Sequence, residues 1–367
     1  MRITDVKYHL LSLPIPDNLK KQGFPEYHFE ILGSKVGFVE VYTDEGVKGF
    51  GPAGREPPFK ADIEGWLKPL LVGENPLEVG RIWEKMYTSL HGGVRGGLMI
   101  RAISGIDVAL WDIIGKVRRA PIYELLGGKH RDRLRAYYSV SPVPDLVDHV
   151  VKVVEEVGYT AVKIRVWKLE EVPLIKALRD ALGRGVDLMV DSNYRCSETM
   201  AYKVARECDR HEYFWFEDPF MPHALEKTAK LAADVDVNIT CGESLGTKYE
   251  FKPLITQGVA DIIMADTDYC GGITEAVKIA ALAQAYDMPC TLHMPTKFPF
   301  AGIQVSAALP NSLFGENTAV AIVTINKSGL VREPIVVRNG YIELPDKPGL
   351  GVEVNEDIAE KYRVKVY

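Results

Sequence analysis

The sequence predicts an α/β protein built on a (β/α)8-type barrel, a modified TIM barrel, with an α+β capping domain formed by the N-terminal region and the C-terminal tail. Three observations predict this fold. A chain of 367 residues is too long for one ordinary small domain. From about residue 134, short apolar runs alternate with amphipathic helical stretches, an order typical of parallel strands. Residues 1–60 and the stretch from 334 onward instead have strand-and-turn character.

The N-terminal region is predicted to hold antiparallel strands followed by helices. Residues 36–51 have the pattern of a β-hairpin around the turn at 43–46. Residues 14–34 are rich in Pro, Gly, Lys and aromatic residues, and their length suits a mobile loop better than a simple connector. Residues 60–125 are mostly helical in pattern. Within them, 101–114 is apolar nearly all round, which predicts a buried helix.

Eight apolar runs are the strand candidates of the barrel, and helical stretches such as 146–157 and 198–210 lie between them. The runs are 135–140, 161–166, 187–190, 213–216, 238–241, 262–265, 289–292 and 312–314. A doubly wound open sheet is the alternative, and it is disfavoured because no Gly-x-Gly-x-x-Gly follows the first strand. We expect a capping domain over 1–130, a barrel over 131–325, and a segment over 326–367 that returns to the capping domain.

Composition and charge restrict the class of partner. The formal net charge is 44 − 50 = −6, which argues against nucleic acid or a membrane as the main partner. The five cysteines contain no CxxC pair and are predicted to be reduced thiols of a cytoplasmic protein. No apolar run is long enough to span a membrane, and the first residues do not resemble a signal peptide. A small molecule is therefore the expected partner.

Three acidic residues follow consecutive strand candidates at equal spacing. Asp191, Glu217 and Glu243 are separated by 217 − 191 = 26 and 243 − 217 = 26 residues, one β/α unit each. Such residues share one rim of a barrel, where three negative charges require a cation, and all-oxygen ligands suit Mg²⁺. Any one of them alone is more simply explained as a loop or helix-cap acid, but three at equal spacing favour a metal site.

Other polar residues are expected at the same rim. Lys163 and Arg165 are two residues apart on one strand and so lie on the same face. Asp266 and His293 follow the sixth and seventh strands and are again one unit apart, since 293 − 266 = 27. An Asp beside a His fixes its tautomer and raises its basicity. The alternative for His293 alone is a hydrogen bond to a backbone carbonyl.

Several ordered segments resemble one family. Two near the N-terminal half are Ala102–Asp112 and Pro121–Gly128. Those around the rim are Val190-Asp191-Ser192-Asn193, Phe216-Glu217-Asp218-Pro219, Gly242-Glu243-Ser244, Asp266 with Gly271-Gly272, and Leu292-His293. The last are Leu309–Glu316 and Pro348–Val352. In these segments the sequence resembles the enolase superfamily, mandelate racemase subgroup, over essentially the whole chain.

The resemblance implies a reaction and a set of site residues. A base removes the proton α to a carboxylate, and a divalent cation stabilises the resulting enediolate. The resemblance assigns Asp191, Glu217 and Glu243 to Mg²⁺, Asp266 and His293 to a dyad, and Glu316 to the active site. Ser139 and Asn193 are expected to contact substrate. The loop residues Phe24, Tyr27, His28 and Arg55 are expected to close over the distal end of the substrate, and family members are usually symmetric homo-oligomers.

The sequence departs from the family at Arg165, where a second Lys usually serves as a base. An Arg stays protonated and is a poor base but a good partner for anions. We therefore expect a dehydratase, with His293 as base and then acid, Asp266 tuning it, and Lys163 and Arg165 stabilising charge. The expected substrate is a polyhydroxylated sugar acid, and the product is a 2-keto-3-deoxy acid.

Three alternatives stay open. The first is a racemase or epimerase that uses Arg165 or Lys163 as a second base. A cycloisomerase of the muconate type is less favoured, because an Asp–His dyad is not the arrangement for that reaction. A non-catalytic binding protein is disfavoured because the ligands and the dyad are intact.

Overall fold

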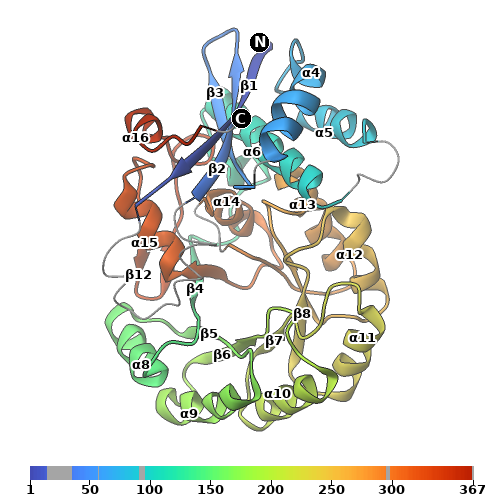
Figure 1. Ribbon diagram of the computed structural model, residues 1–367, viewed down its shortest axis with the longest axis vertical. Helices are drawn as coiled ribbons and strands as arrows, with labels where there is room; N and C mark the ends of the chain where they lie inside the picture. Colours follow the sequence, from blue (N-terminus) through green and yellow to red (C-terminus); the bar gives the residue numbers. More distant parts are fainter. Residues whose placement is uncertain (15–34, 57, 91–95, 295–297, 366–367) are drawn as a thin grey trace.

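The computed structural model describes residues 1–14, 35–56, 58–90, 96–294 and 298–365. An antiparallel capping sheet with its helices lies at the top of Figure 1, and a closed ring of parallel strands lies below it. The predicted fold class, a (β/α)8-type barrel with an α+β capping domain, is confirmed.

The capping region is a three-stranded sheet followed by helices. Its strands are β1 (Ile3–Ser12), β2 (Lys35–Thr43) and β3 (Lys48–Ala53), in the antiparallel order β1-β2-β3. The predicted hairpin is therefore confirmed as β2–β3. The helices are α3 (Pro58–Lys60), the π-helix η2 (Ala61–Leu67), α4 (Lys68–Leu71), α5 (Val79–Thr88), α6 (Leu98–Arg118) and α7 (Ile122–Leu125).

Helix α6 connects the capping sheet to the barrel. Gly51 of β3 lies so close to α6 that a Cβ there would be 2.0 Å from the carbonyl oxygen of Gly105. On its other side, the buried Asp107 accepts hydrogen bonds from the backbone N and the hydroxyl of Thr274, at 2.9 and 2.5 Å. The prediction of a buried helix here is confirmed, since 13 of its residues are buried.

The barrel consists of eight parallel strands closed by pairing between the last and the first. The strands are β4 (Arg133–Val140), β5 (Ala161–Arg165), β6 (Asp187–Asp191), β7 (Trp215–Glu217), β8 (Asn238–Cys241), β9 (Ile262–Ala265), β10 (Cys290–Leu292) and β11 (Gly315–Thr318). The helices around them are α8 (Leu146–Val157), the short 3₁₀ helix η3 (Leu169–Glu171), α9 (Pro173–Leu182), α10 (Glu198–Arg210), α11 (Leu225–Asp234), α12 (Thr247–Thr256), α13 (Gly272–Gln284), α14 (Phe300–Ala308) and α15 (Ala319–Ser328). Within the described ranges, none of the helices combines the length and the apolar character needed to cross a membrane.

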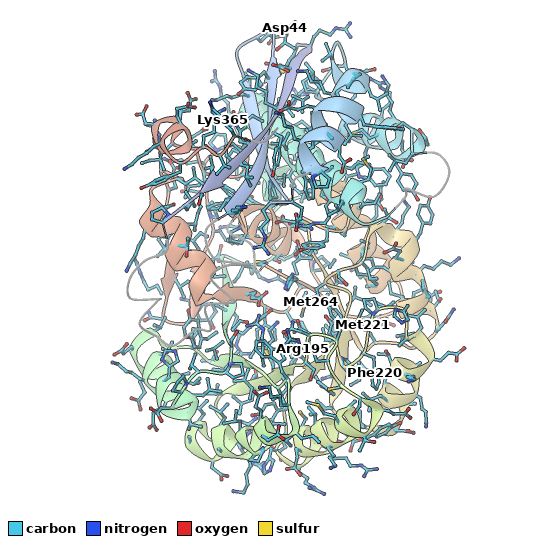
Figure 2. The ribbon with its side chains drawn as sticks, in the orientation of Figure 1. Asp44, Arg195, Phe220, Met221, Met264 and Lys365 are labelled. Carbon is cyan, nitrogen blue, oxygen red and sulfur yellow. The ribbon has the colours of Figure 1, made fainter. Side chains whose placement is uncertain are left out.

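Large side chains fill the barrel beneath its rim. A buried cluster inside the strands comprises Tyr137, Ala161, Met189, Trp215, Ile262, Met264 and Phe314, and Met264 is labelled near the centre of the ring in Figure 2. The prediction that the eighth strand covers 312–314 is wrong. Phe314 belongs to this cluster, and its ring packs edge-on against Trp215 with the ring centroids 5.6 Å apart. The eighth strand, β11, begins at Gly315, where pairing with β10 and β4 starts.

The C-terminal tail first pairs with the barrel and then runs along the capping sheet. β13 (Tyr341–Glu343) pairs with β4 and with β12 (Val337–Arg338). After α16 (Glu356–Lys361), which lies beside the capping sheet in Figure 1, the chain runs along β1. There the backbone N of Val364 donates to Leu10 O at 2.7 Å, and the backbone N of Ser12 donates to Tyr362 O at 2.9 Å.

Candidate active site

Strand register brings three charged residues level at the carboxyl ends of neighbouring strands. Arg165 of β5 is paired with Asp191 of β6, and Asp191 is paired with Glu217 of β7. Glu243 follows β8 by two residues, in the loop beyond the strand end. The structure thus brings Asp191, Glu217 and Glu243 to one rim, as the equal spacing predicts for β/α units.

Lys163 is buried beneath these acids and forms ion pairs with them. Its Nζ donates to both carboxylate oxygens of Glu217, at 2.8 and 2.9 Å, and lies 3.5 Å from Glu316 Oε1 and 3.9 Å from Asp191 Oδ2. Burial alone would lower the pKa of Lys163, but Glu217 and Glu316 outweigh it and raise the pKa well above its ordinary value. Lys163 is therefore held as a cation.

Arg165, two residues after Lys163 on β5, forms an ion pair with Asp191. Its Nε lies 3.5 Å from Asp191 Oδ2, and its Nη1 donates to Ser141 Oγ at 3.1 Å. Asn193 approaches Asp191 from the other side, with its backbone N 2.7 Å from Oδ1 and its Nδ2 3.0 Å from Oδ2. The Asn193 Oδ1 accepts from Trp167 Nε1 at 3.0 Å. The amide that we expected to bind substrate is therefore largely engaged with protein groups.

His293 lies between two carboxylates across the rim. Its Nδ1 is 2.8 Å from Asp266 Oδ2, and its Nε2 is 2.7 Å from Glu243 Oε2 and 3.9 Å from Glu316 Oε2. The second Asp266 oxygen accepts from the backbone N of Asp268 at 2.7 Å, which fixes that carboxylate. The Asp–His dyad expected from the sequence is thus formed in space.

Electrostatics at the rim favour a protonated His293. Burial disfavours the charged ring, but Glu243 and Glu316 outweigh burial and raise the pKa of His293 well above its ordinary value. Glu316 accepts from the backbone N of Met294 at 3.0 Å, and its pKa is held at about 2 because Lys163 and His293 outweigh its burial.

The rim carries an excess of negative charge. Its acids are Asp191, Glu217, Asp218, Glu243, Asp266 and Glu316, and its cations are Lys163, Arg165 and, when protonated, His293. The formal balance with every acid ionised is 3 − 6 = −3. Burial and the neighbouring acids raise the pKa of Glu217 to about 8 and that of Asp218 well above its ordinary value, as expected for acids crowded together. Such a group of carboxylates favours binding of a further cation.

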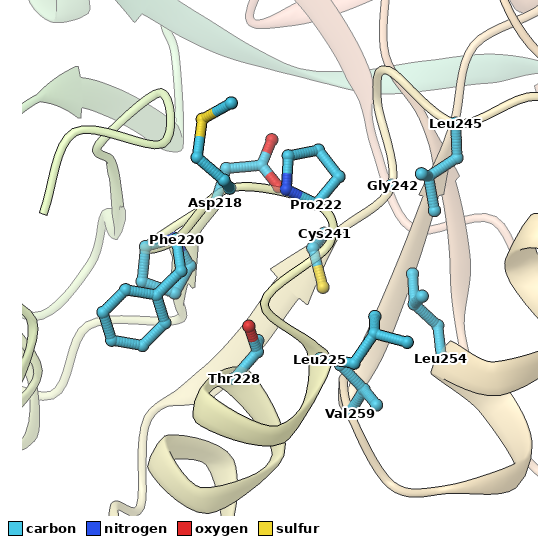
Figure 3. A pocket seen from close by; sticks show the side chains of 12 residues that line it. Asp218, Phe220, Pro222, Leu225, Thr228, Cys241, Gly242, Leu245, Leu254 and Val259 are labelled. Atoms are coloured by element: carbon cyan, nitrogen blue, oxygen red, sulfur yellow. The ribbon is translucent and has the colours of Figure 1, made fainter. Parts of the chain in front are cut away.

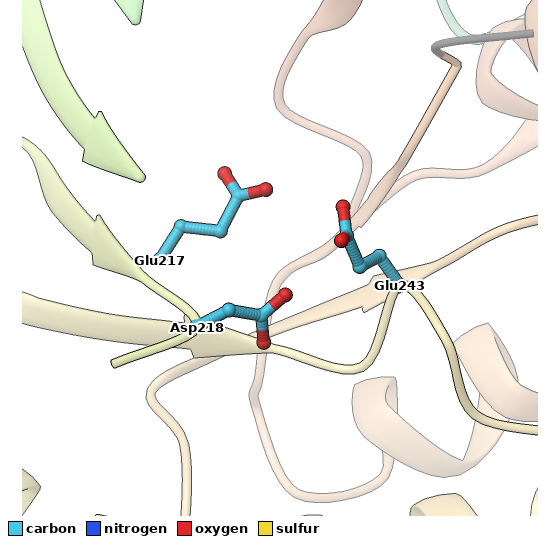
Figure 4. Close-up of side chains that lie close together, drawn as sticks. All are labelled: Glu217, Asp218 and Glu243. Carbon is cyan, nitrogen blue, oxygen red and sulfur yellow. The ribbon is translucent and has the colours of Figure 1, made fainter. Parts of the chain in front are cut away.

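Asp218 is a rim residue to which the sequence analysis gave no role. One oxygen from each of Glu217, Asp218 and Glu243 lies within 4.8 Å of the others, and Figure 4 shows the three carboxylates turned toward one another. Asp218 Oδ2 is buried and has no hydrogen-bond partner within the described ranges. The only sequence signal was its position directly after Glu217. Tyr194 and Ser141, which also contact rim residues, gave no signal in one sequence.

For the other residues predicted to bind substrate, the structure shows no hydrogen bond or ion pair with the rim acids within its described ranges. Ser139 of β4 is buried, and its Oγ has no hydrogen-bond partner among the residues that the structure describes. Arg55 is half-buried after β3 and makes no hydrogen bond or ion pair with the rim in the described part of the chain. Phe24, Tyr27 and His28 lie outside the described residues.

A pocket that includes Asp218 in its lining extends away from the rim between the loops after β7 and β8. Figure 3 shows its lining, which is mostly apolar and includes Phe220, Leu225, Cys241 and Leu254. A polyhydroxylated acid requires several hydrogen-bonding partners, which this lining does not provide. The polar rim is therefore the candidate active site.

The fold and the rim together define a (β/α)8-barrel protein with a capping domain, clustered acids and an Asp–His pair at the carboxyl ends of its strands. Residues 145–358 match the family described as enolase C-terminal domain-like. Residues 32–127 match the mandelate racemase / muconate lactonizing enzyme N-terminal domain. The chain belongs to this family, the mandelate racemase subgroup of the enolase superfamily.

Characterised relatives have sugar-acid names. A D-xylonate dehydratase of Haloferax volcanii is 33% identical, covering 89% of this chain and 85% of its own. A D-galactarolactone cycloisomerase of Agrobacterium fabrum is 31% identical over 99% of both chains. An arabinonate dehydratase of Saccharolobus solfataricus is 30% identical over 95% of both.

Solved structures agree with the fold. A 3,6-anhydro-D-galactonate cycloisomerase from Zobellia galactanivorans has a TM-score of 0.86 and 29% identity, with 100% of both chains covered. A racemase from Streptomyces coelicolor with bound magnesium has a TM-score of 0.85 and 26% identity, covering 99% of this chain and 100% of that one.

Proposed function

We propose that the protein is a Mg²⁺-dependent dehydratase, a hydro-lyase that converts a sugar acid to its 2-keto-3-deoxy acid. The proposal is carried by the placement of His293, whose Nδ1 is held by Asp266 at 2.8 Å and whose Nε2 faces the other rim acids. Lys163 is fully buried in its ion pair with Glu217, and Arg165 is a guanidinium held by Asp191. Dehydration needs a single base, whereas racemisation needs one on each face of the α-carbon.

The residues at the rim fit a magnesium ion. Carboxylates are the hard oxygen donors that Mg²⁺ prefers, and the rim has six of them against three basic side chains. The orphaned, buried Asp218 Oδ2 indicates that the acids are short of positive partners within the described structure. We assign Asp191, Glu217 and Glu243 as the ligands. When bound, Mg²⁺ supplies positive charge beside the substrate carboxylate, where negative charge develops as the α-proton leaves.

The chain's own residues perform the proton transfers in this proposal. Asp266 holds Nδ1 of His293, so Nε2 is the nitrogen that exchanges protons. In this proposal Nε2 is neutral when the substrate is bound, and it accepts the α-proton. The same proton passes to the β-hydroxyl as the carbon–oxygen bond breaks, which releases water. The resulting enol then tautomerises to the keto acid.

The other rim groups stabilise charge or bind hydroxyls in this proposal. Arg165 and Lys163 provide fixed positive charge on the side of the rim opposite His293. Ser139 Oγ, which has no hydrogen-bond partner among the described residues, is a candidate donor to the substrate carboxylate or a nearby hydroxyl. Glu316 is placed between Lys163 and His293 and is a candidate partner for the carboxylate end.

A panel of aldonic and aldaric acids tests the proposal, with the keto product detected as its semicarbazone in Mg²⁺ and in EDTA. We expect product with Mg²⁺ only. In deuterated water, His293→Asn should lose exchange at the α-carbon, while His211→Asn, at a distant histidine on the end of α10, should retain it. Turnover that persists in EDTA, or exchange that persists in His293→Asn, would contradict the proposal.

A cycloisomerase is the second candidate, because two such proteins align with essentially the full chain. The same proton abstraction at His293 expels a ring oxygen in place of a hydroxyl when the substrate is a lactone or anhydro sugar acid. No water is then lost. Mass spectrometry distinguishes the two, since the dehydratase product is lighter than its substrate by one water and the cycloisomerase product has the same mass. A racemase or epimerase instead returns an isomer without a keto group.

A further inference from the structure

The loop after β6 has an unusual backbone at the rim. Asn193 and Tyr194 both have positive φ, 43° and 65°, and Asp218 in the loop after β7 has a φ of 44°. Non-glycine residues rarely adopt this conformation, because it costs free energy that the surrounding structure must offset. Three such residues at one rim indicate that the side chains are held in required positions.

Backbone hydrogen bonds fasten this loop to the loop after β7. Ser192 N donates to Glu217 O at 3.0 Å, Tyr194 N donates to Asp218 O at 2.8 Å, and Cys196 N donates to Pro219 O at 3.2 Å. The positions of Asn193 and Tyr194 are thus fixed relative to the middle strand of the three that carry the rim acids.

The two adjacent side chains contact different acids. Asn193 donates twice to Asp191, from its backbone N and from Nδ2, and Trp167 Nε1 fixes its amide by donating to Oδ1. The Tyr194 hydroxyl lies 3.2 Å from Glu243 Oε1 and 3.0 Å from Ser244 Oγ, and it also interacts with the Asp218 carboxyl. A hydroxyl carries one proton and can accept another, so Tyr194 can donate to Glu243 while accepting from Ser244.

We propose that the Asn193–Tyr194 turn is a bracket that positions Asp191 and Glu243 for the divalent cation. This inference rests on the proposed function. The two carboxylates come from strands separated by β7, and without support they would repel each other and sample several rotamers. Asn193 donates to both oxygens of Asp191, and the Tyr194 hydroxyl faces Oε1 of Glu243. These contacts fix the two rotamers, and each carboxylate oxygen keeps a second lone pair that can face the ion. Outer partners of metal ligands typically contribute about 10–100-fold in metal affinity.

Tyr194→Phe tests the bracket, because it removes one hydroxyl and keeps the ring. The readout is the dissociation constant for Mn²⁺, measured by electron paramagnetic resonance of the free ion, with Mg²⁺ as competitor. We expect about 10-fold weaker binding. The urea midpoint in EDTA should stay at the wild-type value, since a purely structural role would move it. Asn193→Gly keeps the positive φ accessible and should weaken Mn²⁺ binding as well.

Tyr202→Phe is the matched control. Tyr202 donates to Asp234 Oδ2 at 2.6 Å on the outer surface, so its variant also loses one tyrosine–carboxylate bond and should bind Mn²⁺ like the wild type. Equal affinity in Tyr194→Phe and wild type overturns the bracket and leaves the proposed function standing. Failure of the wild type itself to bind Mn²⁺ overturns both.

Discussion

The buried ammonium of Lys163 is predicted to stabilise the folded protein by neutralising part of the negative charge of the rim acids. Lys163→Met tests this directly. The substitution preserves the length of the side chain and removes its charge. Nζ has two contacts of 2.8 and 2.9 Å with Glu217 and lies 3.5 Å from Glu316 and 3.9 Å from Asp191, with no exposure to solvent. Removing one partner of a buried ion pair costs about 3–5 kcal/mol, because the other charge is left without compensation. We expect a loss of that size in EDTA.

Urea denaturation followed by tryptophan fluorescence measures this loss, with and without Mg²⁺. Binding of a ligand at 100 times its dissociation constant stabilises the folded state by about 2.7 kcal/mol. The variant should gain more than the wild type at the same Mg²⁺ concentration, because Lys163 no longer competes for Glu217. Lys85→Met is the control, since the Lys85–Glu74 pair is partly exposed and should contribute less than about 1 kcal/mol. A loss below about 1 kcal/mol for Lys163→Met in EDTA would refute the reasoning.

Three further predictions concern the capping sheet, a tight contact and the departure at position 165. Burial would raise the pKa of Glu40 above its ordinary 4.5, but hydrogen bonds from His9 and Tyr42 outweigh it and hold the pKa at about 2. This stability is present above pH 4.5 and is lost as the pH falls toward 2, so Glu40→Gln should cost about 3 kcal/mol at neutral pH and flatten the acid limb of thermal melts. An acid limb as steep as that of the wild type would contradict this. Gly272 has φ +86°, and a Cβ there would lie 2.3 Å from Asp107 Oδ2, so Gly272→Ala should cost at least about 1–3 kcal/mol in urea unfolding. Gly185→Ala, with open space around it, should cost less than about 1 kcal/mol, and equal losses would count against the contact. Arg165→Lys places a group that can lose its proton on the second face, so recovered substrate should show inverted α-carbon by NMR, and unchanged configuration would argue against Arg165 as the reason that racemisation is disfavoured.

The barrel could be predicted because its signals are local. The pattern of apolar residues along the chain indicates the alternation of strands and helices. The 26-residue spacing of the rim acids follows from the length of a β/α unit. The eighth strand was predicted too early because Phe314 is apolar without being part of a strand. Its side chain fills the bottom of the barrel against Trp215. Local pattern cannot distinguish an apolar residue in a strand from one beneath the strands.

The rim contacts depend on tertiary structure and were only partly predictable. Asn193 was identified as polar and near the site, but its amide is engaged by Asp191 and Trp167, a residue 26 positions earlier. Tyr194 reaches Glu243, 49 positions later, from a left-handed backbone that the residue type does not favour. Such contacts depend on loop conformations that one sequence does not encode in a recognisable pattern.

In the proposed function, rim carboxylates hold a divalent cation across from His293. Anomalous diffraction from crystals soaked in Mn²⁺ tests it most directly. We predict one strong peak in contact with Asp191, Glu217 and Glu243. No peak at the rim after soaking, or a peak that Asp191 does not contact, would contradict it.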